Sequence, residues 1–188
     1  MRRLFWLLLS ALPALAQPFS AGIKAGIPLT DMLNANSVFG YNAPPQRYII
    51  GGEAEVRLPF SLGVEFDALY RHVEYSYVAE SPALNASGGN WEFPLVLKYR
   101  FHFPVARPYV EAGVAWDTIT GLKEAVNHNT TTGVVIGAGV DIHAIVLHIS
   151  PEVRFTRWNT QQVSTVQSTI DVLHTNLNQA EFLVGFTF

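Results

Sequence analysis

Apolar and polar residues alternate along most of this chain, and the pattern is plainest over its last nine residues. In residues 180–188, every second position is apolar: Ala180, Phe182, Val184, Phe186 and Phe188. Successive side chains of a β-strand point to opposite faces, so this alternation predicts a strand with one apolar face. Seven further segments share the pattern: residues 19–27, 50–58, 62–71, 91–101, 109–117, 133–142 and 147–155. Their lengths, about nine to eleven residues, suit strands that cross a membrane at a tilt.

The two faces of these segments differ sharply in charge. The apolar face carries no charged residue, whereas the other face collects ten acids and six bases: Lys24, Glu53, Glu55, Arg57, Glu65, Asp67, Arg71, Glu92, Lys98, Arg100, Glu111, Asp117, Asp141, Glu152, Arg154 and Glu181. On a lipid-facing surface each midplane Lys or Arg would cost about 2–4 kcal/mol. Inside a narrow barrel the charges can pair, and glycines on the same face leave them room. We therefore predict an all-β fold, an eight-stranded antiparallel up-and-down transmembrane β-barrel with these sixteen residues in its lumen.

The connections between the expected strands alternate between short and long. Residues 59–61, 102–108 and 143–146 are short, whereas residues 28–47, 76–90, 118–131 and 158–179 are long and polar. An up-and-down barrel with short periplasmic turns and long outer loops gives this alternation. Both chain termini then lie on the periplasmic side. The β-prone stretches in residues 30–46 and 160–179 are expected to extend the strands beyond the membrane as a protruding sheet.

Aromatic residues are expected at the two ends of the strands, where amphipathic rings favour the headgroup boundary. Tyr70, Trp91 and Trp116 would lie at the loop end. At the turn end would lie Phe19, Phe101 and Phe188.

The first sixteen residues have the pattern of a secretory signal peptide. Arg2 and Arg3 precede an apolar run over residues 4–12, which is too short to span a bilayer, and Ala14 and Ala16 supply a small-x-small cleavage site. We expect residues 1–16 to be removed and residues 17–188 to form one barrel domain.

Charge and cysteine content exclude several kinds of partner. Without Arg2 and Arg3, 10 of the 12 basic residues remain against 15 acidic ones, a net charge of −5. Nucleic-acid binding needs a basic footprint and is not expected. The chain has no cysteine, and therefore neither disulfides nor thiolate metal ligands.

Residues 17–188 resemble a known family of barrels. The resemblance rests on the signal peptide, the eight alternating segments, the alternating loop lengths and terminal Phe188. The chain resembles the small eight-stranded outer-membrane β-barrels of Gram-negative bacteria, such as the membrane domain of outer membrane protein A or outer membrane protein X. This resemblance implies an outer-membrane location, lipid as the surroundings and no peptidoglycan-binding domain within these residues.

Three functions fit this reading. The first is a solid, salt-bridged core with a structural or surface-interaction role for the long loops, which would bind an extracellular ligand or partner. The second is a narrow ion path lined by carboxylates. The third is a soluble periplasmic lipid-binding barrel with its faces inverted, although the 14% charged residues are few for a soluble surface. We favour the first and expect a monomer without cofactors.

The sequence offers little support for catalysis. His148-Ile149-Ser150 resembles the His-x-Ser pair of the barrel lipid A deacylases, but Pro151 follows where that family has Asn. The pair would also lie at the periplasmic end, whereas that family's substrate is in the outer leaflet. Asp141 and His143 lack a nucleophile nearby in the sequence. The six histidines are scattered, so no enzyme activity and no metal site are predicted.

Overall fold

Eight antiparallel strands close into a barrel in the computed structural model, which describes residues 19–35, 41–43, 48–77, 84–103, 106–121, 129–144, 147–167 and 170–187. The barrel strands are β1 (Phe19–Pro28), β4 (Ile49–Arg57), β5 (Leu62–Tyr77), β6 (Leu84–Arg100), β7 (Ala106–Thr120), β8 (Thr130–Ala144), β9 (Leu147–Trp158) and β12 (Asn178–Thr187). Each strand pairs with its neighbour along the chain, and β1 pairs with β12 to close the ring. The expected fold class is confirmed.

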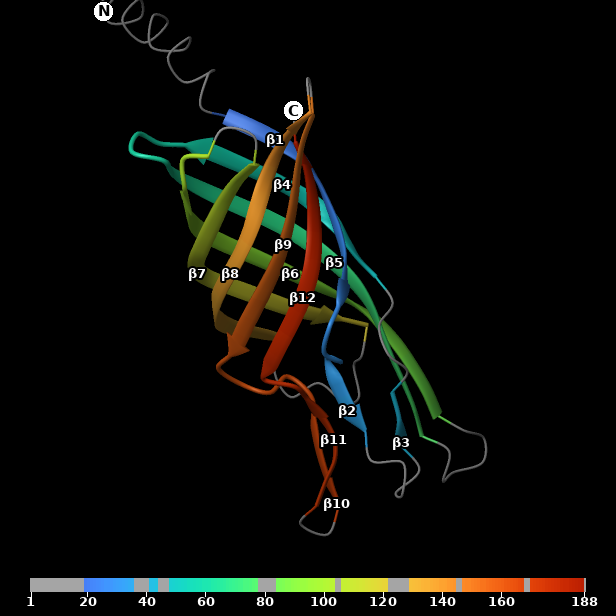
Figure 1. Ribbon diagram of the computed structural model, residues 1–188. Helices are drawn as coiled ribbons and strands as arrows, with labels where there is room; N and C mark the ends of the chain where they lie inside the picture. Colours follow the sequence, from blue (N-terminus) through green and yellow to red (C-terminus); the bar gives the residue numbers. More distant parts are fainter. Residues whose placement is uncertain are drawn as a thin grey trace, which may run out of the picture.

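Four short strands lie outside the ring: β2 (Leu33–Ala35), β3 (Tyr41–Asn42), β10 (Ser164–Gln167) and β11 (Ile170–Thr175). β10, β11 and β2 form a separate three-stranded sheet that projects from one end of the barrel (Figure 1). β1 begins and β12 ends at the opposite end (Figure 1). We call these the loop end and the turn end. The predicted protruding sheet is confirmed.

Several strands are longer than their alternation predicts. β5 and β6 stay paired from Leu62–Tyr99 as far as Tyr77–Leu84, so most of residues 76–90 is strand and not loop. Tyr70 and Trp91 face each other with ring centroids 5.2 Å apart, and seven further residue pairs follow them toward the loop end. The expectation that these aromatics end the strands is therefore wrong. Beyond them the outward side chains His72 and Glu74 are polar and exposed, so the apolar alternation of the outer wall stops although the ladder continues.

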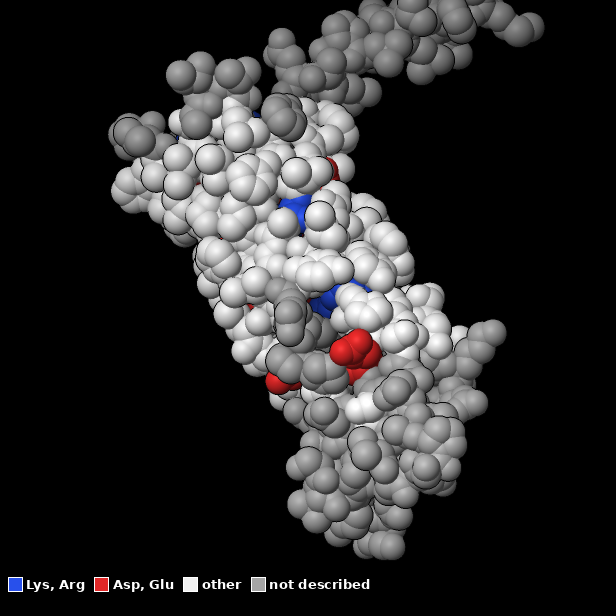
Figure 2. All heavy atoms as spheres, turned by 90° about the vertical axis from the view of Figure 1, so that its right-hand side faces the viewer, with Lys and Arg blue, Asp and Glu red and all other residues white. Residues whose placement is uncertain are grey.

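The outside of the barrel is apolar, as predicted. Ile23, Ile50, Leu97, Val134 and Ile136 are each between 49% and 61% exposed. One side of the wall shows mostly uncharged surface, with only small spots of Lys, Arg, Asp or Glu (Figure 2). None of the described residues forms a helix long and apolar enough to cross a membrane. Residues 1–16 and Phe188 lie outside the described residues.

The charged barrel interior as candidate functional site

The inward face holds the charged side chains singled out from the sequence. Fifteen of the sixteen are buried, each at most 9% exposed. Arg57 differs: its side chain is 37% exposed and lies at the turn end of β4. The alternation of each strand places these residues inside, because their neighbours face outward.

Lys24 on β1 is the centre of the largest group. Its ammonium lies 2.7 Å from Glu65, 3.1 Å from both Glu53 and Glu152, and 3.2 Å from Asp67. These four carboxylates come from three strands, β4, β5 and β9. A fully buried ammonium needs such partners, because an unpaired charge costs several kcal/mol in a low-dielectric interior.

Arg154 crosses the full width of the barrel. Its guanidinium donates to Asp67 at 2.8 Å and to Glu111 at 2.9 Å, and lies 2.9 Å from Glu152. Arg154 is on β9 and Asp67 on β5, which are four strands apart in either direction around the ring. Lys98 on β6 adds contacts to Glu65 at 2.7 Å and to Glu152 at 3.4 Å. The middle of the lumen is therefore filled by interlocked side chains.

A smaller group lies toward the loop end. Arg71 pairs with Glu92 and with Glu181 at 2.6 Å, and donates to Gln179 at 3.0 Å. Asp117 has no cationic partner within hydrogen-bond distance among the described residues. It accepts instead from the amides of Asn90 at 3.0 Å and Gln162 at 3.2 Å.

The group at the turn end is centred on Arg100. Arg100 donates twice to Glu55, at 2.6 Å in each contact, and also to Asp141. This fork geometry is the strongest form of the arginine–carboxylate pair. Tyr109 lies between this group and the central one, donating to Glu152 at 2.6 Å with the Lys98 ammonium 4.4 Å from its ring centroid.

Buried apolar residues also face the lumen, and the sequence reasoning gave them no role. One cluster is Ile49, Leu69 and Leu183; the other is Val96, Ala115, Val135 and Trp158, with Leu177 packed against it. Trp158 and Gln162 fall in a segment expected to be loop, and Tyr109 was passed over because it is uncharged. The period-two pattern places Tyr109 on the inward face, and that signal could have found it.

Gly185 makes room for Glu53 beside Lys24. A Cβ at this position would lie 2.5 Å from Glu53 Oε1, and Glu53 is held by Lys24. We expect Gly185→Ala to lower the free energy of unfolding by about 1–3 kcal/mol through overpacking. Urea titration of the folded barrel would measure it. Gly52→Ala is the matched control, because its Cβ would meet nothing closer than 3.7 Å. Equal stability of the two variants would contradict this.

The candidate catalytic pair is not assembled. Ser150 donates to Asp141 at 2.7 Å, whereas His148 Nδ1 lies 3.1 Å from the Arg57 guanidinium. The His143 and His148 rings pack at 4.1 Å between centroids. His148 is thus held by Arg57 and His143, and Ser150 by a carboxylate.

Two carboxylate triplets are close enough to hold a metal ion. They are Glu53, Glu65 and Asp67, and Glu65, Glu111 and Glu152. In the first triplet, Lys24 contacts all three members; in the second, Lys98 does so at 2.7–3.4 Å. The lysine ammonium groups thus take the place that a cation would need.

Comparisons with known proteins agree with this architecture. The family model described as "Outer membrane protein beta-barrel domain" matches residues 4–188. The outer membrane protein OprG from Pseudomonas aeruginosa is similar in structure, with a TM-score of 0.60 and 15% identity over 90% of this chain and 92% of that one. Neisserial surface protein A gives a TM-score of 0.56 and 13% identity over 91% and 96%. No curated protein sequence matches the chain.

Proposed function

The chain belongs to the outer membrane protein β-barrel domain family, and from this premise we propose that it is a closed barrel whose role lies in its extracellular strands. The turn end would face the periplasm and the loop end the outside of the cell. Residues 1–16 would direct export and be removed. A catalytic role is not part of this proposal, because Ser150 is bonded to Asp141 and not to His148.

The observation that carries this proposal is the contact that Arg154 makes with Asp67 across the lumen. A barrel of eight strands has an interior just wide enough for side chains. Arg154 reaches Asp67 on the opposite strand, and both side chains are 0% exposed. Solute passage would require these ion pairs to open inside a low-dielectric interior, which makes transport a poor use of this scaffold.

The loop end offers surface for interaction instead. The seven β5–β6 pairs beyond Tyr70 and Trp91 correspond to up to about 23 Å of strand. The β10–β11–β2 sheet is extended toward the barrel by backbone bonds from Asn176 to Met32 at 2.7 Å and from Thr175 to Val163 at 2.9 Å. Recognition residues are common on loops held by a rigid scaffold.

The first test is the conductance of the folded chain in a planar bilayer. We expect an inserted barrel that gives no discrete openings, because the central ion pairs close the lumen. Regular single-channel steps would contradict the closed-barrel proposal.

A second candidate, a narrow cation path, has one observation in its favour. The buried interior carries ten acids against five bases, and one carboxylate oxygen in each of Glu53, Asp67 and Glu92 has no hydrogen-bond partner among the described residues. If openings occur, loss of their cation preference in Glu111→Gln or Asp117→Asn would assign the path to these acids.

The surface role is tested by shortening the β5–β6 hairpin at its loop end. Residues 74–87 are replaced by Asn-Gly, which closes a two-residue turn after the Val73–Gly88 pair. Bacteria displaying the complete chain or the trimmed chain are compared for attachment to matrix-coated plates and to one another. We expect cells with the complete chain to attach more than cells without the protein, and cells with the trimmed chain to attach no more than cells without it. Equal attachment by both, at equal amounts in the membrane, would remove the β5–β6 extension from the proposal.

A further inference from the structure

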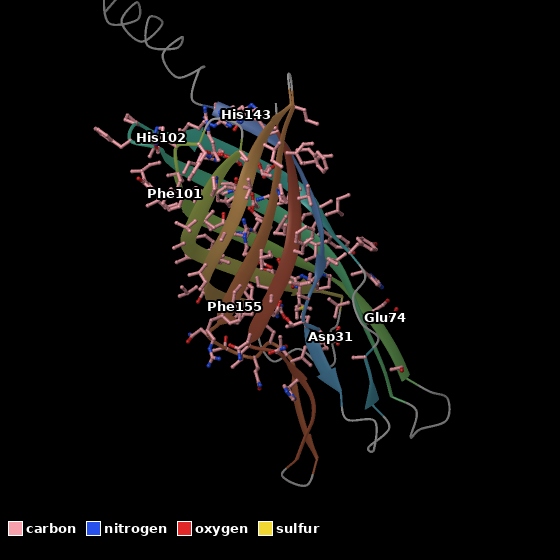
Figure 3. The ribbon with its side chains drawn as sticks, in the orientation of Figure 1. Asp31, Glu74, Phe101, His102, His143 and Phe155 are labelled. Carbon is pink, nitrogen blue, oxygen red and sulfur yellow. The ribbon has the colours of Figure 1, made fainter. Side chains whose placement is uncertain are left out.

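A small basic hollow lies at the turn end of the barrel, beside the buried pair of Arg100 and Glu55. Its volume is about 120 Å³, and its polar lining is Arg57, Ser61, Arg100, His102 and Arg107. These residues come from the end of β4, the turn to β5, the end of β6 and the start of β7. Phe101 and His102 mark this end of the barrel, opposite Asp31 and Glu74 (Figure 3).

The hollow is built on a fixed backbone. Leu58 N donates to Leu62 O at 2.9 Å, and Arg100 N donates to Ser61 O at 2.9 Å, which joins the turn to β6. Phe60 and Ser61 both have φ of 64°, a left-handed conformation that non-glycine residues adopt at a cost. In this conformation Ser61 Oγ lies 3.2 Å from His102 Nε2, so the two polar groups line the hollow together.

The positive charge of the hollow is only partly neutralised. Arg100 takes both carboxylates of this end, Glu55 and Asp141. Arg57 has a distant contact with Glu55 at 3.9 Å, and its Nε has no hydrogen-bond partner among the described residues. Arg107 is exposed and makes no ion pair within the described part of the chain. The Arg107 guanidinium, and the part of the Arg57 guanidinium that does not contact His148 Nδ1, are therefore available to an anion.

The size and surroundings of the hollow indicate the ligand. Its volume of about 120 Å³ leaves room for a group of the size of phosphate. Guanidinium forks bind phosphate in a bidentate manner. Leu58, Leu62 and Phe101 border the same hollow, and Leu58 and Phe101 belong to the exposed apolar wall, at 41% and 43% exposure.

We propose that this hollow binds the phosphate group of a phospholipid in the leaflet at the turn end, with Arg107 and Arg57 holding the phosphate and the acyl chains lying along the wall beside Leu58 and Phe101. The site would fix one lipid at the rim of the barrel. Free phosphate shares the same recognition chemistry, and the test separates the two sources.

The test uses the full chain folded in nonionic micelles and native mass spectrometry. The probes are dioctanoyl phosphatidylglycerol, dioctanoylglycerol, which lacks the phosphate, and sodium phosphate. We expect a one-to-one complex with the phospholipid, none with dioctanoylglycerol, and about tenfold weaker phospholipid binding in Arg107→Gln, the effect of losing one charge-assisted contact. Arg107→Lys should recover part of the affinity.

Arg157→Gln is the matched control, because Arg157 is an exposed arginine at the loop end with no ion pair among the described residues. Its phospholipid affinity should equal that of the unchanged chain. If the chain bound sodium phosphate but not the phospholipid, and Arg107→Gln weakened that binding, the phosphate site would stand but its assignment to a lipid would be overturned. Equal phospholipid affinity in the unchanged chain, Arg107→Gln and Arg57→Gln would overturn the site itself.

Discussion

Replacing Arg154 by methionine is expected to lower the free energy of unfolding of the barrel by about 3–5 kcal/mol. The substitution removes the cation that contacts Asp67, Glu111 and Glu152 and leaves these buried carboxylates with fewer partners. Removing one member of a buried ion pair is far more costly than replacing the whole pair, because the remaining charge stays desolvated. Urea unfolding in lipid vesicles, followed by the gel mobility of the folded form, measures the change.

Two companion variants separate the ion network from a general effect of losing an arginine. Arg157→Met removes an exposed arginine on the outward face of the same strand and should change stability by no more than about 0.5 kcal/mol. Arg154→Met combined with Glu111→Gln should recover part of the loss, since neighbouring sites couple. A loss of the same size in Arg157→Met would show that the interior pairs are not the cause.

The second large effect is expected on the outer wall, for Ile136→Arg. Ile136 is 55% exposed and faces away from the lumen, next to Gly137, which packs against Glu111 of the central group. It therefore lies near the middle of the membrane-facing wall, where an arginine costs about 2–4 kcal/mol. The measurement is again the free energy of unfolding in vesicles.

Thr132→Arg on the same strand is the control for depth. Thr132 pairs with Trp116, which we place at the headgroup boundary, so the cost should fall to about 0–1 kcal/mol. If Ile136→Arg left the free energy of unfolding unchanged, the outer wall would face water, as it does in a soluble lipid-binding barrel.

The faces of the strands could be predicted from the sequence, whereas the contacts between them could not. Alternation places Arg154 and Asp67 inside the barrel, because each has apolar neighbours on both sides. It carries no information on height within the lumen or on position around the ring. The contact between β9 and β5 depends on strand register and on the diameter of the closed ring, which appear only once all eight strands are paired.

The lengths of β5 and β6 were missed for a related reason. At His72, Glu74 and Ser76 the outward face is polar, so the apolar period that marks a membrane strand ends although the pairing of β5 with β6 continues. Trp158 was missed because its strand was expected to end at residue 155. The alternation that buries Arg154 continues to Trp158, which packs inside with Val96, Ala115 and Val135.

The arrangement around Lys24 has a consequence for how the protein is assembled. Lys24 belongs to the first strand, yet it contacts Glu152, 128 residues later, and its strand forms the closing seam with β12. In an open sheet that lacks this strand, Glu53, Glu65, Asp67 and Glu152 repel one another with one cation fewer between them. Such distant contacts form late because they must wait for the intervening chain to be ordered. Docking of β1 therefore reduces the repulsion between the carboxylates of β4, β5 and β9. This favours closure of the barrel in one cooperative step and makes partly closed intermediates short-lived.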